Sequence, residues 1–137
     1  MATLVKNQQY NASAAQVWDL VGDFYTVDTW IPGIASTVRD DVRKTRTITT
    51  HDGARLVERL LDEGPHFHHY HIDDSGTLPL RNVTARLAVT ETGPQQSAID
   101  WTVSFDPAIG STEADAAAFI SGFYQACLDR VAVELGV

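Results

Sequence analysis

The spacing of apolar positions divides the chain into an opening strand and helix, a long run of strands, and a closing helix. Residues 3–10 are expected to form the first strand, and Ser13 and Gln16 have the spacing of a helix-capping box. A second short helical stretch is expected around residues 27–30, where a Pro-Gly pair ends it. The apolar side of the first helix consists of Val17, Trp18, Leu20, Val21 and Phe24.

The middle of the chain is rich in Val, Ile, Thr and Leu, and this composition favours strands. Turn-forming residues, such as Asp52-Gly53 and Gly93-Pro94, separate the strand-like segments. Because short turns join consecutive segments, we expect an antiparallel meander. The predicted strands are residues 35–40, 43–50, 54–62, 66–73, 82–92 and 96–105.

The last segment carries apolar residues three and four positions apart, as one face of a helix does. Thr112 is a suitable N-cap, with Glu113 and Asp115 in the first turn. The order β-α-α-β6-α predicts an α+β fold, in which a curved seven-stranded antiparallel sheet wraps around one long C-terminal helix. The apolar positions of that helix are Ala116, Phe119, Ile120, Phe123, Cys127, Leu128, Val131 and Leu135.

A strongly curved sheet cannot lie flat against one straight helix, so this architecture can enclose a cavity. Alternation within the strands indicates which side chains face that space. A lining that is mostly apolar with few polar groups suits a small-molecule pocket, but the same side chains could instead fill a solid core. The inward residues are Leu56, Glu58, Leu60, Val83, Ala85, Leu87, Val89, Ile99, Trp101, Val103 and Phe105, with Phe119, Phe123 and Cys127 from the helix.

Several stretches together resemble the SRPBCC superfamily of START and birch-pollen-allergen-like proteins, and especially its bacterial polyketide cyclase/dehydrase-like branch. They are SAAQVWDLVGDF, DTWIPG, RTITTHDGARLVERLLD, GTLPLRNVTARLAV, IDWTVSFDP and FISGFYQACLDRV. The resemblance implies a single helix-grip domain over residues 1–137, with an internal ligand cavity. It does not fix the function, because this fold hosts carriers, receptors and enzymes.

The stretches VERLLD and LPLRN are also similar to those of plant abscisic-acid receptors. That resemblance implies that Glu58 anchors the polar end of a ligand and that the loops 51–53 and 78–82 gate the pocket. The receptors' serine-glycine-leucine-proline gate is absent here. Gly33-Ile34 stands where their cavity lysine would be.

Glu58 is the polar position that says most about chemistry. A buried carboxylate without a partner is costly and tends to hold its proton, which would suit acid–base catalysis or a ligand anchor. The alternatives are a structural pair with an Arg or Tyr, or a place at the exposed rim. Tyr70 and His68 are the other candidates for proton transfer. The expected ligand-binding residues are Trp30, Leu56, Glu58, Leu60, Tyr70, Ile72, Arg81, Val83, Ala85, Trp101, Phe119, Phe123 and Cys127.

The stretch HFHHYHI holds four of the five histidines. On a strand, His66 and His68 share one face with Tyr70, while His69 and His71 lie on the other. No third ligand is evident for the second pair, so we expect no metal site. His68 is the histidine expected near the pocket, and Cys127 is expected to be a small core hydrophobe rather than a nucleophile.

Composition narrows the possible partners. The net charge of −8 argues against nucleic acid or an anionic membrane surface as a partner. A single cysteine permits no internal disulfide, and no segment has the features of a signal peptide or a membrane span. We therefore expect a cytoplasmic monomer or homodimer without a cofactor.

Two functions fit these features, and both require binding of a small, largely apolar molecule. One is a cyclase, aromatase or dehydratase acting on a polyketide-like substrate. The other is a non-enzymatic carrier or sensor of a hydrophobic ligand. The sequence leaves both open.

Overall fold

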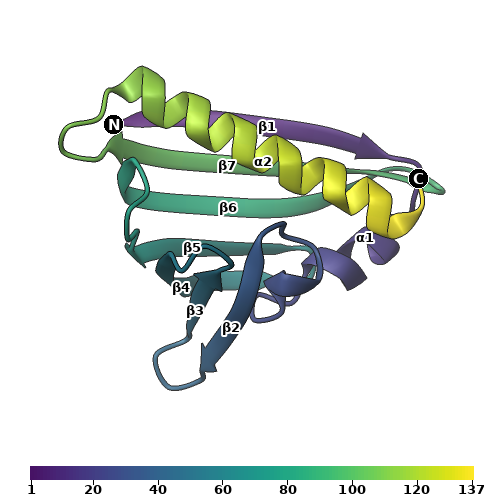
Figure 1. Cartoon of the computed structure of the whole chain (residues 1–137). Helices are drawn as coiled ribbons and strands as arrows, with labels where there is room; N and C mark the ends of the chain where they lie inside the picture. The colour runs from purple at the N-terminus through teal and green to yellow at the C-terminus, as the bar shows by residue number, and fades with distance from the viewer.

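The computed structural model describes all 137 residues, and its seven strands form one antiparallel sheet with a long helix lying across it (Figure 1). The predicted α+β helix-grip fold is confirmed. The strands are β1 (Ala2–Tyr10), β2 (Ile34–Asp40), β3 (Thr45–Thr50), β4 (Arg55–Gly64), β5 (Phe67–Asp74), β6 (Leu80–Gly93) and β7 (Gln96–Pro107). The helices are α1 (Ala14–Val21), the 3₁₀ turn η1 (Val27–Thr29) and α2 (Glu113–Leu135).

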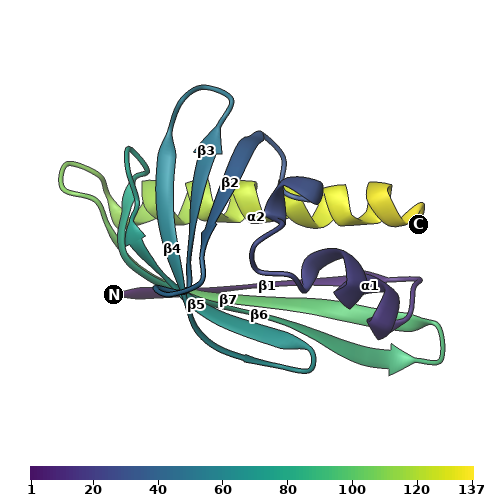
Figure 2. The same ribbon diagram turned by 90° about the horizontal axis from the view of Figure 1, so that it is seen from below.

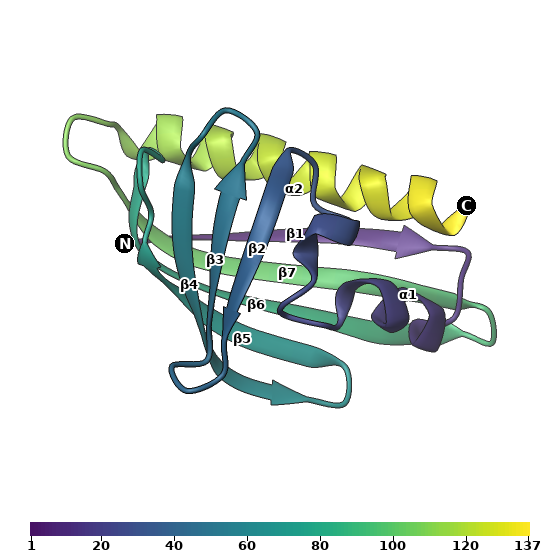
Figure 3. The same cartoon turned by 60° about the horizontal axis from the view of Figure 1, so that its bottom comes forward.

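The sheet is a meander from β2 to β7, and β1 joins it beside β7. Register shifts interrupt the pairing of β4 with β5 at two places, next to Val57/Glu58 and next to Leu60/Asp62. Such bulges bend a strand and increase its twist. Figures 2 and 3 show the result: β2, β3 and β4 turn steeply out of the plane of β1, β7 and β6 and rise beside α2.

Local sequence signals explain where the helices begin and end. The Ser13 side chain accepts a hydrogen bond from the backbone of Gln16, whose side chain accepts one from the backbone of Ser13, so the predicted capping box is present. The Thr112 side chain caps α2 by accepting a hydrogen bond from the backbone N–H of Asp115. Gly136, in the left-handed conformation, ends α2. Phe24 lies past the end of α1, although it is buried as predicted.

The core lies between the sheet and the two α-helices. The inward positions predicted by alternation on β6 and β7 are all buried, from Val83 to Val89 and from Ile99 to Phe105. They pack with Val17 and Val21 of α1 and with the buried face of α2. No helix in the structure combines the length and hydrophobicity needed to cross a membrane.

Candidate functional site

A cavity of about 570 Å³ lies between α2 and the strongly turned half of the sheet. Its volume is in the range of small-molecule sites. The structure therefore has a cavity where the sequence left a solid core as an alternative. Strands β2 to β7, the middle of α2 and three loops contribute to its lining: Ile31, Pro32, Gly33, Ile34, Arg46, Ile48, Thr50, His51, Asp52, Ala54, Leu56, Glu58, Tyr70, Ile72, Thr77, Leu78, Pro79, Leu80, Trp101, Phe119, Ile120, Phe123 and Tyr124.

A second, more open groove of about 960 Å³ runs over the outer face of β2 to β4. Its lining is mostly Arg and Asp, and several of these charges pair with each other, as in Arg59–Asp73 and Arg39–Asp41. Surface pairs of this kind are common on solvated sheet faces. The inner cavity is therefore the candidate site.

Aromatic rings form one wall of the cavity. The ring of Trp101 stacks on Tyr124 with centroids 3.6 Å apart and an interplanar angle of 8°. Trp101 Nε1 donates a hydrogen bond of 3.1 Å to the hydroxyl of Tyr70. On α2, Phe119 and Phe123 lie nearly parallel and are each 37% exposed, which places them at the opening. This wall offers flat apolar surface from the interior to the mouth.

Burial raises the pKa of Tyr70, and burial together with the neighbouring Tyr70 raises the pKa of Tyr124. Both phenols are therefore protonated at neutral pH. In that state they can donate hydrogen bonds to a ligand but cannot act as bases.

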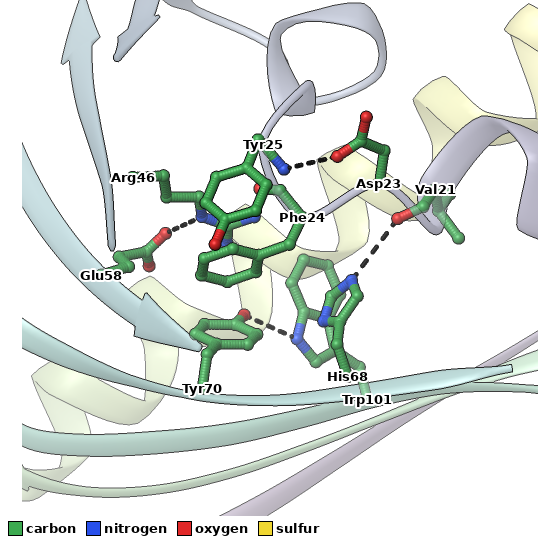
Figure 4. A network of polar contacts seen from close by, with 9 residues as sticks. All are labelled: Val21, Asp23, Phe24, Tyr25, Arg46, Glu58, His68, Tyr70 and Trp101. Atoms are coloured by element: carbon green, nitrogen blue, oxygen red, sulfur yellow. Dashed lines mark hydrogen bonds and ion pairs between the residues drawn. The ribbon is translucent and has the colours of Figure 1, made fainter. Parts of the chain in front are cut away.

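One end of the cavity is polar, and it is built from an ion pair (Figure 4). Arg46 of β3 donates from Nε to Glu58 Oε1 of β4 at 2.8 Å and from Nη1 to the carbonyl of Phe24 at 2.7 Å. Its guanidinium also lies over the Phe24 ring, 3.9 Å from the centroid. The side chains of Arg46 and Glu58 are 3% and 8% exposed. Of the alternatives for Glu58, the structure has the buried pair with an arginine.

Each member of the pair keeps one atom without a partner in the protein. Arg46 Nη2 and Glu58 Oε2 make no hydrogen bond, and neither belongs to the fully enclosed polar atoms that lack one. Both residues line the cavity, so these two atoms are the groups of the ion pair that a ligand there could contact. One is a donor and the other an acceptor.

A family model described as polyketide cyclase / dehydrase and lipid transport matches residues 1–136. The chain belongs to this family. The resemblance to the SRPBCC superfamily drawn from the sequence is thereby confirmed. No curated protein matches the sequence.

Solved structures support the same fold. An uncharacterised protein from Bacillus thuringiensis superposes with a TM-score of 0.92 at 24% identity, covering 99% of this chain and 100% of that one. The Zhui aromatase/cyclase from a Streptomyces species has a TM-score of 0.81 at 12% identity, covering 98% and 93%. A START superfamily protein from Mycobacterium smegmatis has a TM-score of 0.73 at 13% identity, covering 94% and 96%. At these identities the likeness concerns the fold alone.

Seven residues predicted to contact a ligand line the cavity in this family member: Leu56, Glu58, Tyr70, Ile72, Trp101, Phe119 and Phe123. They come from β4, β5, β7 and α2, so the fold gathers segments that are far apart in the sequence.

Six predicted residues lie outside the lining. Trp30, Val83, Ala85 and Cys127 are sealed in the core, where Trp30 packs next to Trp101 with ring centroids 5.7 Å apart. Leu60 packs at the edge of the core, and Arg81 is exposed and donates to the carbonyl of Pro107. Alternation identifies the inward face of a strand, but it does not show which part of that face borders the cavity.

His68 also lies behind the cavity wall rather than on it. Its ring is surrounded by Trp18, Phe24 and Tyr70 at centroid distances of 5.7 to 5.8 Å, and Nε2 lies 3.4 Å from the carbonyl of Val21. Nδ1 is enclosed without a partner. Burial, with the nearby charge of Arg46, lowers the pKa of His68 to about 4. His68 is therefore neutral at physiological pH.

The remaining histidines do not lie close enough together to form a set of metal ligands. His69 and His71 lie half-buried on the outer face, as predicted, and His71 Nδ1 is 2.9 Å from Asp73. No group of three or more potential metal ligands comes together in the structure.

Sequence reasoning missed Arg46 and Tyr124. Arg46 shares a strand face with Ile48, so the alternation of residues 45–50 could have placed it inward. Tyr124 lies four residues after Ile120, on the buried stripe of α2 next to the one selected. Of the two loops expected to flank the pocket, His51, Asp52 and residues 78–80 line it, whereas Gly53, Arg81 and Asn82 do not.

Proposed function

We propose that the protein binds one small, largely apolar molecule between its sheet and α2 and acts as a carrier or sensor of that molecule. The observation that supports this proposal most strongly is a cavity with an aliphatic and aromatic lining and one buried ion pair, Arg46 and Glu58. A site that buries most of a ligand against apolar groups and orients it with a few polar ones is typical of small-molecule recognition.

The arrangement suggests how the ligand lies. A flat ring system would stack along Trp101 and Tyr124 and extend towards Phe119 and Phe123 at the opening. Its polar end would reach Arg46 and Glu58. The loops around His51 and Leu78 flank the opening, so they are the segments that would close over a bound molecule.

The enzymatic alternative is cyclase, aromatase or dehydratase chemistry. It is favoured by membership in the family and by Oε2 of Glu58, an oxygen of a buried carboxylate in the lining that makes no hydrogen bond within the protein. In that role Glu58 would take a proton from the substrate while Arg46 and the tyrosine phenols stabilise negative charge on its oxygen. The binder is preferred because Glu58 is already paired with Arg46 and His68 is sealed away from the cavity.

Binding is tested with pyrene as the apolar probe and a pair of matched variants. Leu56 lines the cavity, whereas Leu61 of the same strand is exposed and does not belong to the lining. We expect saturable binding of one pyrene, weakened at least about tenfold by Leu56→Trp and unchanged by Leu61→Trp. Equal loss in both variants, or no saturable binding to the unmodified protein, would contradict the proposal.

The carrier and the enzyme are separated by native mass spectrometry of protein purified from its own host. A carrier returns its retained molecule with one unchanged mass after prolonged incubation. A mass that changes with time, and stops changing in Glu58→Gln, would support the enzymatic alternative instead.

A further inference from the structure

The charge balance of the cavity defines its ligand more closely. We infer that the site selects an electrically neutral molecule whose polar end is a hydroxyl, a group that donates one hydrogen bond and accepts another, and that Glu58 excludes carboxylates. The inference rests on the proposed binding function.

The charged groups inside the cavity compensate each other. Of the residues that line the cavity, only Arg46, Glu58, Asp52 and His51 can carry charge. The positive charge of Arg46 is compensated at 2.8 Å by Glu58, so the interior of the cavity is neutral overall. A buried anion is costly unless an uncompensated positive charge meets it. A carboxylate ligand would find none in the interior, because His51 lies at the exposed turn beside Asp52 and Arg46 is already paired.

The entrance of the cavity carries a negative charge. Asp52 lies at the exposed turn between β3 and β4, and hydrogen bonds from the Thr50 hydroxyl and the backbone of Ala54 lower the pKa of its carboxyl group. Asp52 therefore stays negative at neutral pH. Together with the net charge of −8, it disfavours the approach of an anion.

The polar end of the cavity offers one hydrogen-bond donor and one acceptor. Arg46 Nη2 and Glu58 Oε2 are a donor and an acceptor on directly paired residues of β3 and β4, and neither has a partner within the protein. A ligand hydroxyl can accept from the first and donate to the second. A carbonyl oxygen can use only the donor, and a carboxylate would oppose the charge of Glu58.

The test compares three probes of nearly equal size: pyrene, 1-hydroxypyrene and pyrene-1-carboxylate, at about pH 6.5, where the phenol is neutral and the carboxylate ionised. We expect 1-hydroxypyrene to bind about tenfold more tightly than pyrene and at least about tenfold more tightly than the carboxylate. If pyrene binds but the carboxylate binds as tightly as 1-hydroxypyrene, the inference is overturned while the proposed function stands. If none of the three binds, the proposed function itself fails.

Two charge-matched variants locate the effect. Glu58→Gln keeps an oxygen for Arg46 and removes the compensating charge, so pyrene-1-carboxylate should bind at least about tenfold more tightly than to the unmodified protein. Glu63→Gln removes the same charge from an exposed position of the same strand and should leave all three affinities unchanged. Equal effects of the two variants would show that overall charge excludes the carboxylate and would overturn the role of Glu58. If Glu58→Gln does not fold, the comparison of probes on the unmodified protein decides.

Discussion

Arg46 is a buried side chain whose polar contacts connect three segments of the chain. It joins β3 to β4 through Glu58 and to the segment after α1 through the carbonyl of Phe24. A buried ion pair adds little net stability by itself, because both charges lose their hydration. Removing one partner is strongly destabilising, because the remaining charge is left in an apolar environment.

We therefore expect Arg46→Met to lower the free energy of unfolding by about 3–5 kcal/mol, because it leaves the Glu58 carboxylate unpaired. The double variant Arg46→Met/Glu58→Leu should recover most of that loss. Urea denaturation followed by circular dichroism measures both. A single variant that costs under about 1 kcal/mol would show that the pair is not enclosed as described.

His68 gives a pH dependence whose sign follows from its burial. The unfolded chain protonates this histidine near pH 6.5, whereas the folded protein does so only near 4. Between these values the unfolded state binds more protons. The contribution of neutral His68 to stability is therefore fully present above pH 6.5 and is lost as the pH falls towards 4. The loss attributable to His68 is about 3 kcal/mol.

That loss is isolated by comparing variants in urea denaturation at a series of pH values. His68→Phe should remove this part of the acid sensitivity, and the remainder will come from other groups. His69→Gln, a substitution on the outer face of the same strand, should retain it. If His68→Phe and the unmodified protein lose stability in parallel, the imidazole is not neutral in the folded state.

At the residue scale, sequence analysis succeeded where the question was which face of a strand a side chain lies on. It placed Glu58 and Tyr70 inward, but it could not show that Arg46 stands opposite Glu58, because register comes from turns and bulges rather than from alternation. It also could not separate Cys127 from Phe123, which occupy one helical stripe while only the second borders the cavity.

At the scale of elements, the turn between β5 and β6 is fixed by contact with the start of β4. Gly76 has φ of 56°, and a Cβ atom there would lie 2.5 Å from the backbone oxygen of Arg55. Gly53, in the other turn at the mouth, has φ of 88° and nothing within 4 Å. The two glycines thus share a left-handed conformation and differ in their surroundings.

Gly53→Ala should cost about 1 kcal/mol through conformational strain alone. Gly76→Ala should cost about 2 kcal/mol more, because the turn must move away from β4. Chemical denaturation gives the two stabilities, and pyrene titration shows whether displacing the turn beside Leu78 weakens binding. Equal costs would mean that the turn is not held against β4.

The elements themselves were predictable because alternation and capping act locally. The observed strand ends differ by a few residues from those expected; β6, for example, begins at Leu80 rather than at residue 82. The size of the cavity was not predictable. It depends on how sharply β4 bends, and the bulges next to Glu58 and Leu60 that accompany this bend leave no clear mark in the apolar pattern.

At the scale of the whole molecule, β1 completes the sheet by pairing with β7, so that Ala2 faces Phe105 and Tyr10 faces Ser97. The hydroxyl of Tyr10 also donates to the carbonyl of Leu128 in α2. The first ten residues therefore make their native contacts with residues about 90 or more positions later in the chain. Long-range pairing of this kind slows folding, because a large loop must close first.

We expect refolding from urea to take milliseconds to seconds, followed in stopped-flow experiments by the fluorescence of the buried Trp30 and Trp101. A variant with Tyr10→Phe should unfold faster and refold at nearly the same rate if the contact of β1 with α2 forms late. Refolding within microseconds would contradict this order.

The fully buried Cys127 makes the rate of thiol labelling a measure of how often the protein opens. Burial raises the pKa of its thiol to about 12, and the side chain has no exposed surface, so neither the thiolate nor access is available in the folded state. A thiol-specific reagent will therefore modify the native chain only when α2 leaves the sheet. Because the protein has no other cysteine, the labelling rate reports only the opening that exposes Cys127. A molecule that binds between the sheet and α2 should lower the labelling rate of Cys127 as its occupancy rises.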